Sequence, residues 1–127
     1  MNIIVILKML SDQNRLRIVN LIKENPMCVT EIQAITGLQQ SNTSRHLEKL
    51  KSNNIVKSYK DSNKVFYILN TDFLNDYTFL KKLIFQDIKK ETIFLDDLEK
   101  LNKYKENGYS CEDLRHSDFD FDKLTKM

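Results

Sequence analysis

Apolar residues recur at helical spacing through the first part of the chain and predict a series of short helices. Ile3–Leu10 is a first apolar segment, and Ser11 and Asp12 supply a cap for a helix over Gln13–Glu24. The inward stripe of that helix contains Leu16, Ile18, Val19, Leu21 and Ile22, whereas Arg15, Arg17 and Lys23 are expected in solvent. Both helices should therefore bury one side against a common core.

A proline interrupts this helical pattern. Pro26 disfavours a helical conformation at Asn25, so Met27–Val29 should be extended and able to pair with a later strand. Helical spacing resumes over Val29–Leu38, with the isoleucines inward, and Gly37 stops this short helix.

A polar segment, Gln39–Lys51, follows directly and has two different faces when it is wound as a helix. Thr43, Leu47 and Leu50 fall on one face, and Asn42, Arg45, His46 and Lys49 fall on the other. Ser41 is a good N-cap for this helix. On its own the polar face is typical of any solvated helix. Preceded by a short helix and a glycine turn, it predicts a helix-turn-helix whose second helix can enter a DNA groove.

Two β-prone runs come next and predict a hairpin. Ile55–Lys60 and Lys64–Leu69 flank the turn residues Asp61–Asn63. A helix-turn-helix followed at once by a basic hairpin is a winged helix. The predicted fold class is therefore mainly α with a small β-hairpin wing, a winged helix-turn-helix.

The pattern changes after residue 70. Residues 71–105 contain no proline or glycine, and apolar residues continue at helical spacing with one break at Glu91. The stripe consists of Phe73, Tyr77, Leu80, Ile84, Ile88, Leu95 and Leu98, widened by Phe79, Leu83, Phe85, Ile93, Phe94 and Leu101. Such a wide stripe favours one long helix, or two helices in line with a kink near Lys90–Thr92, that pairs with a second subunit. The alternative is that these residues complete the core of the monomer.

Three parts follow from these patterns. We expect a DNA-binding domain over residues 1–70, a helical dimerisation segment over 71–107, and an acidic tail over 108–127 that begins after the stop at Asn107 and Gly108.

Composition and charge sharpen this picture. With 127 residues, 41% hydrophobic and 30% charged, the chain suits one compact domain with an added helical part. The apolar start is too short to span a bilayer and lacks the features of a signal peptide, so a cytoplasmic protein is expected. Net charge is only +2, but residues 39–64 carry +4 and residues 106–122 carry −5. The basic excess thus lies on the predicted DNA-reading part.

Three stretches together resemble the ArsR/SmtB family of bacterial and archaeal repressors. Leu7–Ile18 resembles the family's opening helices, Ser41–Leu50 its recognition helix, and Ile55–Leu69 its wing. The resemblance extends over about Ile3 to Lys90. It implies a homodimeric winged-helix repressor that sits on a palindromic operator and leaves it when an inducer binds.

The family's sensing residues are only partly present. Where its arsenic sensors have Cys-Val-Cys, this chain has Cys28-Val29-Thr30, so one thiol would need help from Cys111 or from a neighbouring subunit to hold a metalloid. The positions of the family's zinc ligands are here Thr71, Phe73, Ile84 and Asp87. No metal and no cofactor are therefore expected, and a site made of Cys111, Asp113 and His116 is only a minor alternative.

The cysteines leave three interpretations open. Because Cys28 and Cys111 are far apart in sequence, a disulfide scaffold is not expected and reduced thiols are the simpler interpretation. Cys28 can be a small buried residue. It can be a redox- or persulfide-sensing thiol that pairs with Cys111, or it can bind a metalloid together with Cys111.

The predicted function is sequence-specific DNA binding by a homodimeric transcriptional repressor. Base edges would be read by Gln40, Asn42, Arg45 and His46, and phosphates or the minor groove would be contacted by Ser41, Ser44, Lys49, Lys60, Asn63 and Lys64. The alternative is a winged-helix protein-interaction module without DNA-binding activity. An enzyme is not expected, since no carboxylate pair, nucleophile with a base, or phosphate-binding glycine loop is visible.

Overall fold

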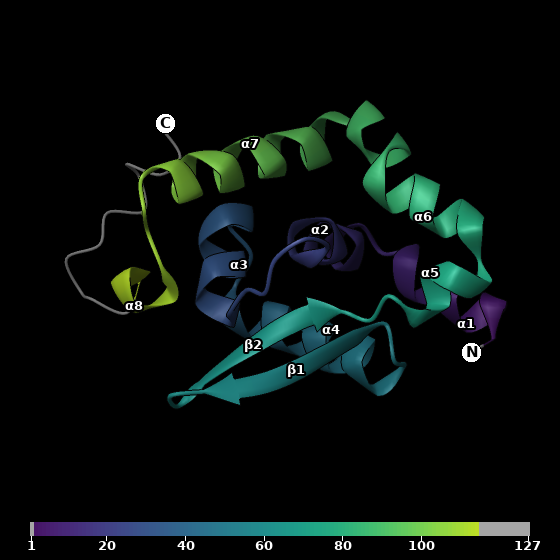
Figure 1. Ribbon diagram of the computed structural model, residues 1–127, viewed down its shortest axis with the longest axis horizontal. Helices are drawn as coiled ribbons and strands as arrows, with labels where there is room; N and C mark the ends of the chain where they lie inside the picture. The colour runs from purple at the N-terminus through teal and green to yellow at the C-terminus, as the bar shows by residue number, and fades with distance from the viewer. Residues whose placement is uncertain (1, 115–127) are drawn as a thin grey trace.

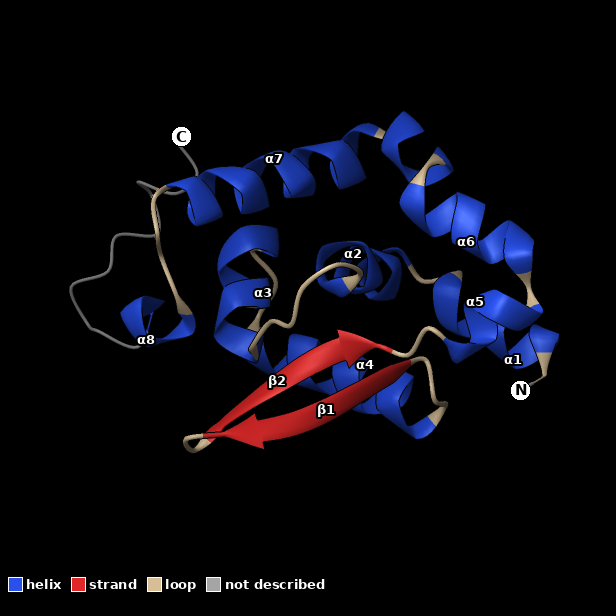
Figure 2. Cartoon of the chain, viewed as in Figure 1, coloured by secondary structure: helices blue, strands red, loops and turns tan. Residues whose placement is uncertain are grey.

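The computed structural model describes residues 2–114 as a mainly helical fold with a two-stranded antiparallel hairpin, as predicted (Figures 1 and 2). In chain order the elements are α1 (Ile3–Leu10), α2 (Gln13–Ile22), α3 (Val29–Thr36), α4 (Gln40–Ser52), β1 (Val56–Asp61), β2 (Lys64–Leu69), α5 (Asp72–Asp76), α6 (Thr78–Phe85), the 3-10 helix η1 (Asp87–Lys90), α7 (Thr92–Glu106) and α8 (Cys111–Leu114). Among residues 2–114, none of the helices has the length and apolar character needed to cross a bilayer.

Local capping explains where the first helices begin and end. The Asp12 side chain accepts a hydrogen bond from the backbone N–H of Arg15 at 3.1 Å, which confirms the predicted cap of α2. Gly37 ends α3 in a left-handed conformation with φ of 76°. The predicted Ser41 cap is wrong: the cap position is extended Gln39, two residues earlier, and α4 begins at Gln40.

The wing, which we define as the β1–β2 hairpin, has a tighter turn than the sequence suggests. Asp61 pairs with Lys64, so the turn contains only Ser62 and Asn63, with φ of 50° and 70°. Left-handed conformations at both turn positions match the right-handed twist of the strands. Beside β2, Met27 pairs with Tyr67 through backbone hydrogen bonds, which confirms an extended stretch after Pro26.

The core lies between α2, α3, α4 and the wing. Ile18, Ile22 and Ile32 are fully enclosed there. The inward side of α4, with Thr43, Leu47 and Leu50, is buried as predicted. This burial fixes the rotation of α4, and the opposite side of the helix is thereby turned outward.

Residues 71–107 are helical, but they form neither one long helix nor two helices in line. The helix breaks at Tyr77, at Gln86 and at Glu91, so the kink predicted near Lys90–Thr92 is confirmed. After it, α7 crosses over α2 and α3 (Figure 1). Phe94, Leu101 and Tyr104 of α7 are buried in the monomer core. The alternative that apolar residues of α7 complete the monomer is therefore correct for these three, whereas Leu95 stays exposed.

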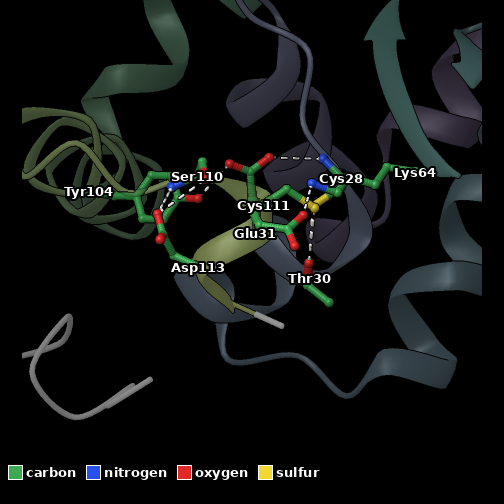
Figure 3. The surroundings of a disulfide bond; sticks show 9 residues. Cys28, Thr30, Glu31, Lys64, Tyr104, Ser110, Cys111 and Asp113 are labelled. Carbon is green, nitrogen blue, oxygen red and sulfur yellow. Dashed lines mark hydrogen bonds and ion pairs between the residues drawn. A yellow bond between two sulfur atoms is a disulfide. The ribbon is translucent and has the colours of Figure 1, made fainter. Parts of the chain in front are cut away.

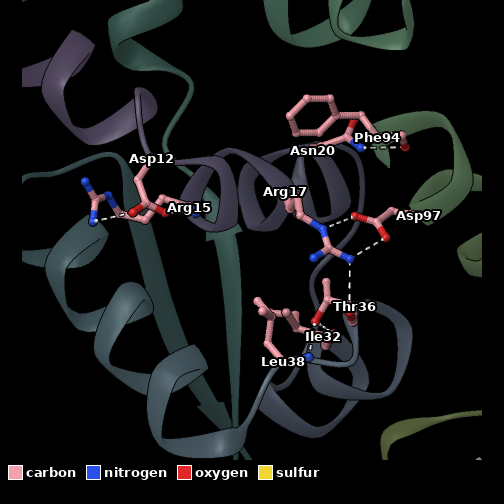
Figure 4. A network of polar contacts seen from close by, with 9 residues as sticks. All are labelled: Asp12, Arg15, Arg17, Asn20, Ile32, Thr36, Leu38, Phe94 and Asp97. Atoms are coloured by element: carbon pink, nitrogen blue, oxygen red, sulfur yellow. Dashed lines mark hydrogen bonds and ion pairs between the residues drawn. The ribbon is translucent and has the colours of Figure 1, made fainter. Parts of the chain in front are cut away.

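A buried ion pair holds α7 in this position (Figure 4). Arg17 donates two hydrogen bonds to the Asp97 carboxylate, at 2.8 and 3.0 Å, and one to the carbonyl of Thr36 at 3.0 Å. Both side chains are largely buried, with 12% and 2% of their surface exposed. The prediction that Arg17 lies in solvent is wrong, because its partner comes from a helix 80 residues away in sequence.

Lys23 and Asn20 add further links between α2 and the C-terminal helices. The Lys23 ammonium donates to the carbonyl of Ile84 at 2.9 Å, and the Asn20 amide donates to the carbonyl of Phe94 at 3.1 Å. Lys23 is thus half-buried rather than in solvent. Together these contacts tie α6 and α7 to the helix that supports the helix-turn-helix.

Candidate nucleic-acid interface

The outer face of α4, which we define as Asn42, Arg45, His46 and Lys49, is the polar side that the core leaves outward. Arg45 and Lys49 are exposed, and Asn42 and His46 are half-buried. Arg45 donates a hydrogen bond to the Asn42 side-chain oxygen at 2.6 Å, within one helical turn. The guanidinium and amide are therefore held next to each other as a pair of groups suited to base edges.

Beside this face lies an open depression of about 510 Å³, lined by the outer face of α4 and by Arg15. The sequence analysis did not predict Arg15 as a member of this site, because the helical pattern of α2 places Arg15 in solvent. Its guanidinium donates to the carbonyls of Met9 and Lys8, at 2.8 and 3.3 Å. The end of α1 thus positions a fixed cation beside α4, and no spacing rule within one helix could have shown it.

The environment of His46 favours the neutral imidazole. Burial lowers the pKa of His46 below its usual 6.5, and the cations Arg15, Arg45 and Lys49 lower it further, whereas Asp12 opposes them. His46 is thus uncharged near neutral pH in the isolated protein and can both donate and accept a hydrogen bond.

The first turn of α4 carries the other predicted contacts. Gln40 and Ser41 are exposed, Ser44 is half-buried, and the side chain of Gln39 makes no capping hydrogen bond. Backbone N–H groups in the first turn of a helix are suited to a phosphate.

The wing residues lie on different faces of the hairpin. Lys60 pairs with Val65 and Asp61 with Lys64, so Lys60 and Lys64 project from opposite faces near the turn. Lys60 and Asn63 are exposed. Lys64 forms an ion pair with Glu112 of α8, a partner that the sequence did not indicate.

The two cysteines form a disulfide, which corrects the expectation of separate reduced thiols (Figure 3). Cys28 is the residue before α3 and Cys111 opens α8, with 6.4 Å between their Cα atoms. Both are buried, as the interpretation of Cys28 as a buried residue expected. Because 83 residues separate them in sequence, only the fold of α7 back over α3 shows that they meet.

Glu31 and Tyr104 complete the surroundings of the disulfide (Figure 3). The buried Glu31 carboxylate accepts the backbone N–H of Cys28 at 3.1 Å and the Tyr104 hydroxyl at 2.6 Å. Burial, and then the hydrogen bond to Glu31, raise the pKa of Tyr104. Tyr104 therefore remains a hydrogen-bond donor at any ordinary pH.

Cysteine and glutamate, the residue types found at the disulfide, also occur as ligands in metal sites. One ligand atom each from Cys28, Glu31 and Cys111 lies within 4.8 Å of the others. While the two sulfurs are bonded to each other, neither is a thiolate that could ligate an ion. His116, part of the minor alternative for a metal site, lies outside the described residues.

Comparison with known proteins connects this arrangement to bacterial regulators. Residues 12–58, from the cap of α2 into β1, match the family model described as "Bacterial regulatory protein, arsR family". The chain is 43% identical over 70 residues to the cadmium resistance transcriptional regulatory protein CadC of Listeria innocua, a match that covers 54% of this chain and 59% of that protein. This chain thus spans about three-fifths of the length of that relative.

Two further relatives agree with this match. The arsenical resistance operon repressor of Staphylococcus aureus is 37% identical over 71 residues, covering 56% of this chain and 68% of that protein. Among solved structures, HlyU from Vibrio cholerae superposes with a TM-score of 0.57 and 28% identity, over 65% of this chain and 89% of that chain.

Proposed function

Because this chain belongs to the ArsR family of bacterial regulatory proteins, we propose that it is a sequence-specific DNA-binding transcriptional regulator. The observation that carries the proposal is the outer face of α4, where a guanidinium, an amide, an imidazole and an ammonium gather over an open depression. Its opposite side is fully occupied by the core, so this face is available to a partner. Since that partner is DNA, we propose that the protein works in the cytoplasm.

The proposed contacts divide into those that read bases and those that hold the backbone. Gln40, Asn42, Arg45 and His46 read base edges in the major groove, with Arg45 on a guanine. Ser41, Ser44, Lys49, Lys60, Asn63 and Lys64 contact phosphates or the minor groove. Arg15 joins the second group, because its guanidinium lines the same depression.

We further propose that the protein acts as a homodimer on a palindromic operator. Exposed apolar side chains on α1 and α6 support this: Ile4, Val5, Leu7 and Phe79 are 54%, 38%, 41% and 54% exposed. Both helices lie toward the same end of the molecule in Figure 1. Burying this apolar surface against a second copy would stabilise a dimer and set two copies of α4 about 34 Å apart, on successive major grooves.

We propose a matching division of labour along the chain. Residues 1–70 contact DNA, and residues 71–107 support the dimer through α6 and hold α7 on α2. Of the acidic tail predicted over residues 108–127, residues 108–114 include α8, which the disulfide joins to Cys28, and residues 115–127 lie outside the described residues.

The proposed role is that of a repressor released from DNA by an inducer that acts on Cys28 and Cys111. Because the two sulfurs are joined here, a thiol oxidant or persulfide is the inducer that the geometry supports best. A trivalent metalloid is the second candidate, favoured by the three ligand atoms within 4.8 Å, and it requires both thiols to be reduced.

Selection of bound duplexes from a random-sequence library tests the proposed function. We expect enrichment of a two-fold symmetric sequence whose half-sites lie about 10 base pairs apart. If no duplex is retained even at low salt, the rival function, a protein-interaction module without DNA-binding activity, replaces this one.

A further inference from the structure

A disulfide and an ion pair link α8 to the side of the molecule on which the wing lies. The disulfide joins Cys111 to Cys28, and the next residue, Glu112, forms an ion pair with Lys64 at the start of β2 (Figure 3). Cys28 itself adjoins the wing, because Met27 pairs with Tyr67 of β2. A covalent bond thus holds an acidic residue against a cation of the proposed DNA-binding surface.

The ion pair removes Lys64 from the cations that the wing offers to a phosphate. Only 19% of the Lys64 side chain is exposed, whereas Lys60, on the opposite face, is exposed. A lysine paired with a carboxylate releases fewer counterions from DNA than a free one, because its charge is already compensated. With α8 in place, the wing is therefore less able to bind a polyanion.

We propose that α8 is a redox-controlled cover of the wing. The Cys28–Cys111 disulfide keeps Glu112 on Lys64 and lowers DNA affinity, and reduction releases α8 and frees Lys64 for a phosphate. This inference rests on the proposed function and specifies how the thiol pair acts on the DNA-binding surface.

The chemistry requires one two-electron exchange. A dithiol reductant attacks the disulfide and forms its own disulfide, while the Cys28 and Cys111 sulfurs each take one electron and one proton and become thiols. In the reverse direction a peroxide removes two electrons and two protons from the thiols, closes the disulfide, and is itself reduced to two molecules of water.

Besides the disulfide and the ion pair, α8 is held by the burial of Leu114 in the core and by a contact of 3.6 Å between the Thr30 hydroxyl and the Cys111 sulfur. The helix spans only Cys111–Leu114, and its buried residues are Cys111 and Leu114. So short a helix has no stability of its own. The remaining ion pair is between Lys64 and a largely exposed Glu112, and it competes with water and salt. We therefore expect cleavage of the disulfide to weaken the attachment of α8 and to shift it toward the free state.

Two thiol states of the full chain are compared in the test. One sample is reduced with dithiothreitol, and the other is oxidised with hydrogen peroxide that is then removed. Thiols are counted in both samples. Affinity for a labelled duplex of mixed sequence is measured by fluorescence anisotropy over a salt series, and hydrogen exchange of residues 109–114 is followed without DNA.

Four variants isolate the proposed contact. Glu112→Gln removes the negative charge that pairs with Lys64, and Glu106→Gln removes an equal charge from the exposed end of α7 as a matched control. Lys64→Gln removes the positive charge through which Glu112 is proposed to act. A double Cys28→Ser and Cys111→Ser variant should bind as the reduced protein whatever the treatment.

We expect reduction to raise the affinity of the wild type on the order of tenfold, in the usual range of coupling between sites. The salt dependence should steepen by about 0.9 for each lysine freed. Glu112→Gln should strengthen binding by the oxidised form only, and Glu106→Gln should leave the redox effect unchanged. On the Lys64→Gln background, Glu112→Gln should no longer change DNA affinity. In the wild type without DNA, hydrogen exchange at residues 109–114 should become faster on reduction.

Several results would overturn the inference while the proposed function stands. These are equal DNA affinity in both thiol states, two free thiols after peroxide treatment, unchanged exchange at residues 109–114, or an effect of Glu112→Gln that persists on the Lys64→Gln background. Absence of DNA binding in either state would instead reject the proposed function, and this inference with it.

Discussion

At the scale of single residues, charged side chains in this protein are positioned by partners that lie far away in sequence. Arg17 is held by Asp97 of α7, and Arg15 by carbonyls at the end of α1. The helical pattern of α2 correctly indicates which of its residues are apolar, but it cannot show that α7 will cover the side that carries Arg17. The outer face of α4 could be predicted because its apolar residues alone determine its rotation.

Loss of Asp97 should be far more costly than loss of an exposed acid. In Asp97→Ala the guanidinium of Arg17 remains largely buried without its carboxylate, and we expect the free energy of unfolding to fall by about 3–5 kcal/mol. Asp87→Ala removes the partner of Lys90 in an exposed pair and should cost under about 1 kcal/mol. Urea denaturation of both variants checks this. Equal losses would show that the Arg17 pair does not stabilise the fold.

The lowered pKa of His46 predicts how DNA affinity changes with pH. In the free protein burial and the neighbouring cations hold the pKa below 6.5. The negative charge of bound DNA raises the pKa of His46, so the complex takes up a proton. DNA affinity therefore rises as pH falls from the pKa of His46 in the complex to its lower pKa in the free protein.

Affinity measured across this pH range should show that rise in the wild type and lose it in His46→Gln. Because the chain has only two histidines, imidazole NMR signals of the same variant identify the group that titrates. A pKa of His46 that is unchanged by DNA would mean that this side chain does not lie in the interface with DNA.

At the scale of elements, local signals predicted the first half of the chain well. Caps, a glycine stop and a proline break act over a few residues, and α1 to α4 and the wing lie close to where these signals put them. The C-terminal half could not be predicted in the same way. No proline or glycine marks the breaks around Tyr77 and Gln86, and the structure shows that Leu80, Ile84 and Leu101 beyond them are buried in one core.

The turn between α3 and α4 depends on the left-handed conformation of Gly37. A Cβ atom at Gly37 would meet no neighbour within 4 Å, so any cost of substitution comes from the backbone alone. We expect Gly37→Ala to destabilise the protein by about 1–2 kcal/mol, and Gly37→Asn by less, because asparagine tolerates positive φ. Denaturation midpoints measure both. If alanine is as stable as glycine, the turn adopts another conformation in solution.

At the scale of the whole molecule, apolar side chains of α1 and α6 stay exposed, whereas Phe94, Leu101 and Tyr104 of α7 enter the monomer core. Residues 71–105 contain more apolar residues than one helix needs to pack on a small domain. The sequence could not show which of them belong to the monomer core and which to a dimer interface, because this depends on the direction of the chain after α6. In the structure, Phe94 and Leu101 are buried in the monomer core, and Leu7 and Phe79 are exposed.

Charged substitutions should separate the proposed dimer face from other exposed apolar residues. Leu7→Glu and Phe79→Glu should yield monomers, since a carboxylate would be buried unpaired in the dimer. Leu95→Glu on α7 is the matched control, because Leu95 and Leu7 are similarly exposed at 40% and 41%, and it should leave the association unchanged. Sedimentation of the three variants tests this. Dimers of the Leu7 and Phe79 variants would exclude this face.

The central claim, that the outer face of α4 binds DNA, is tested most directly by the duplex affinity of Arg45→Ala. Its control is Lys105→Ala, which removes one exposed cation from the end of α7. On the selected operator, Arg45→Ala should lose about 1–3 kcal/mol of binding free energy and discriminate less between operator and mixed sequence, whereas Lys105→Ala should bind like the wild type. Binding by Arg45→Ala with wild-type affinity and specificity would contradict the claim.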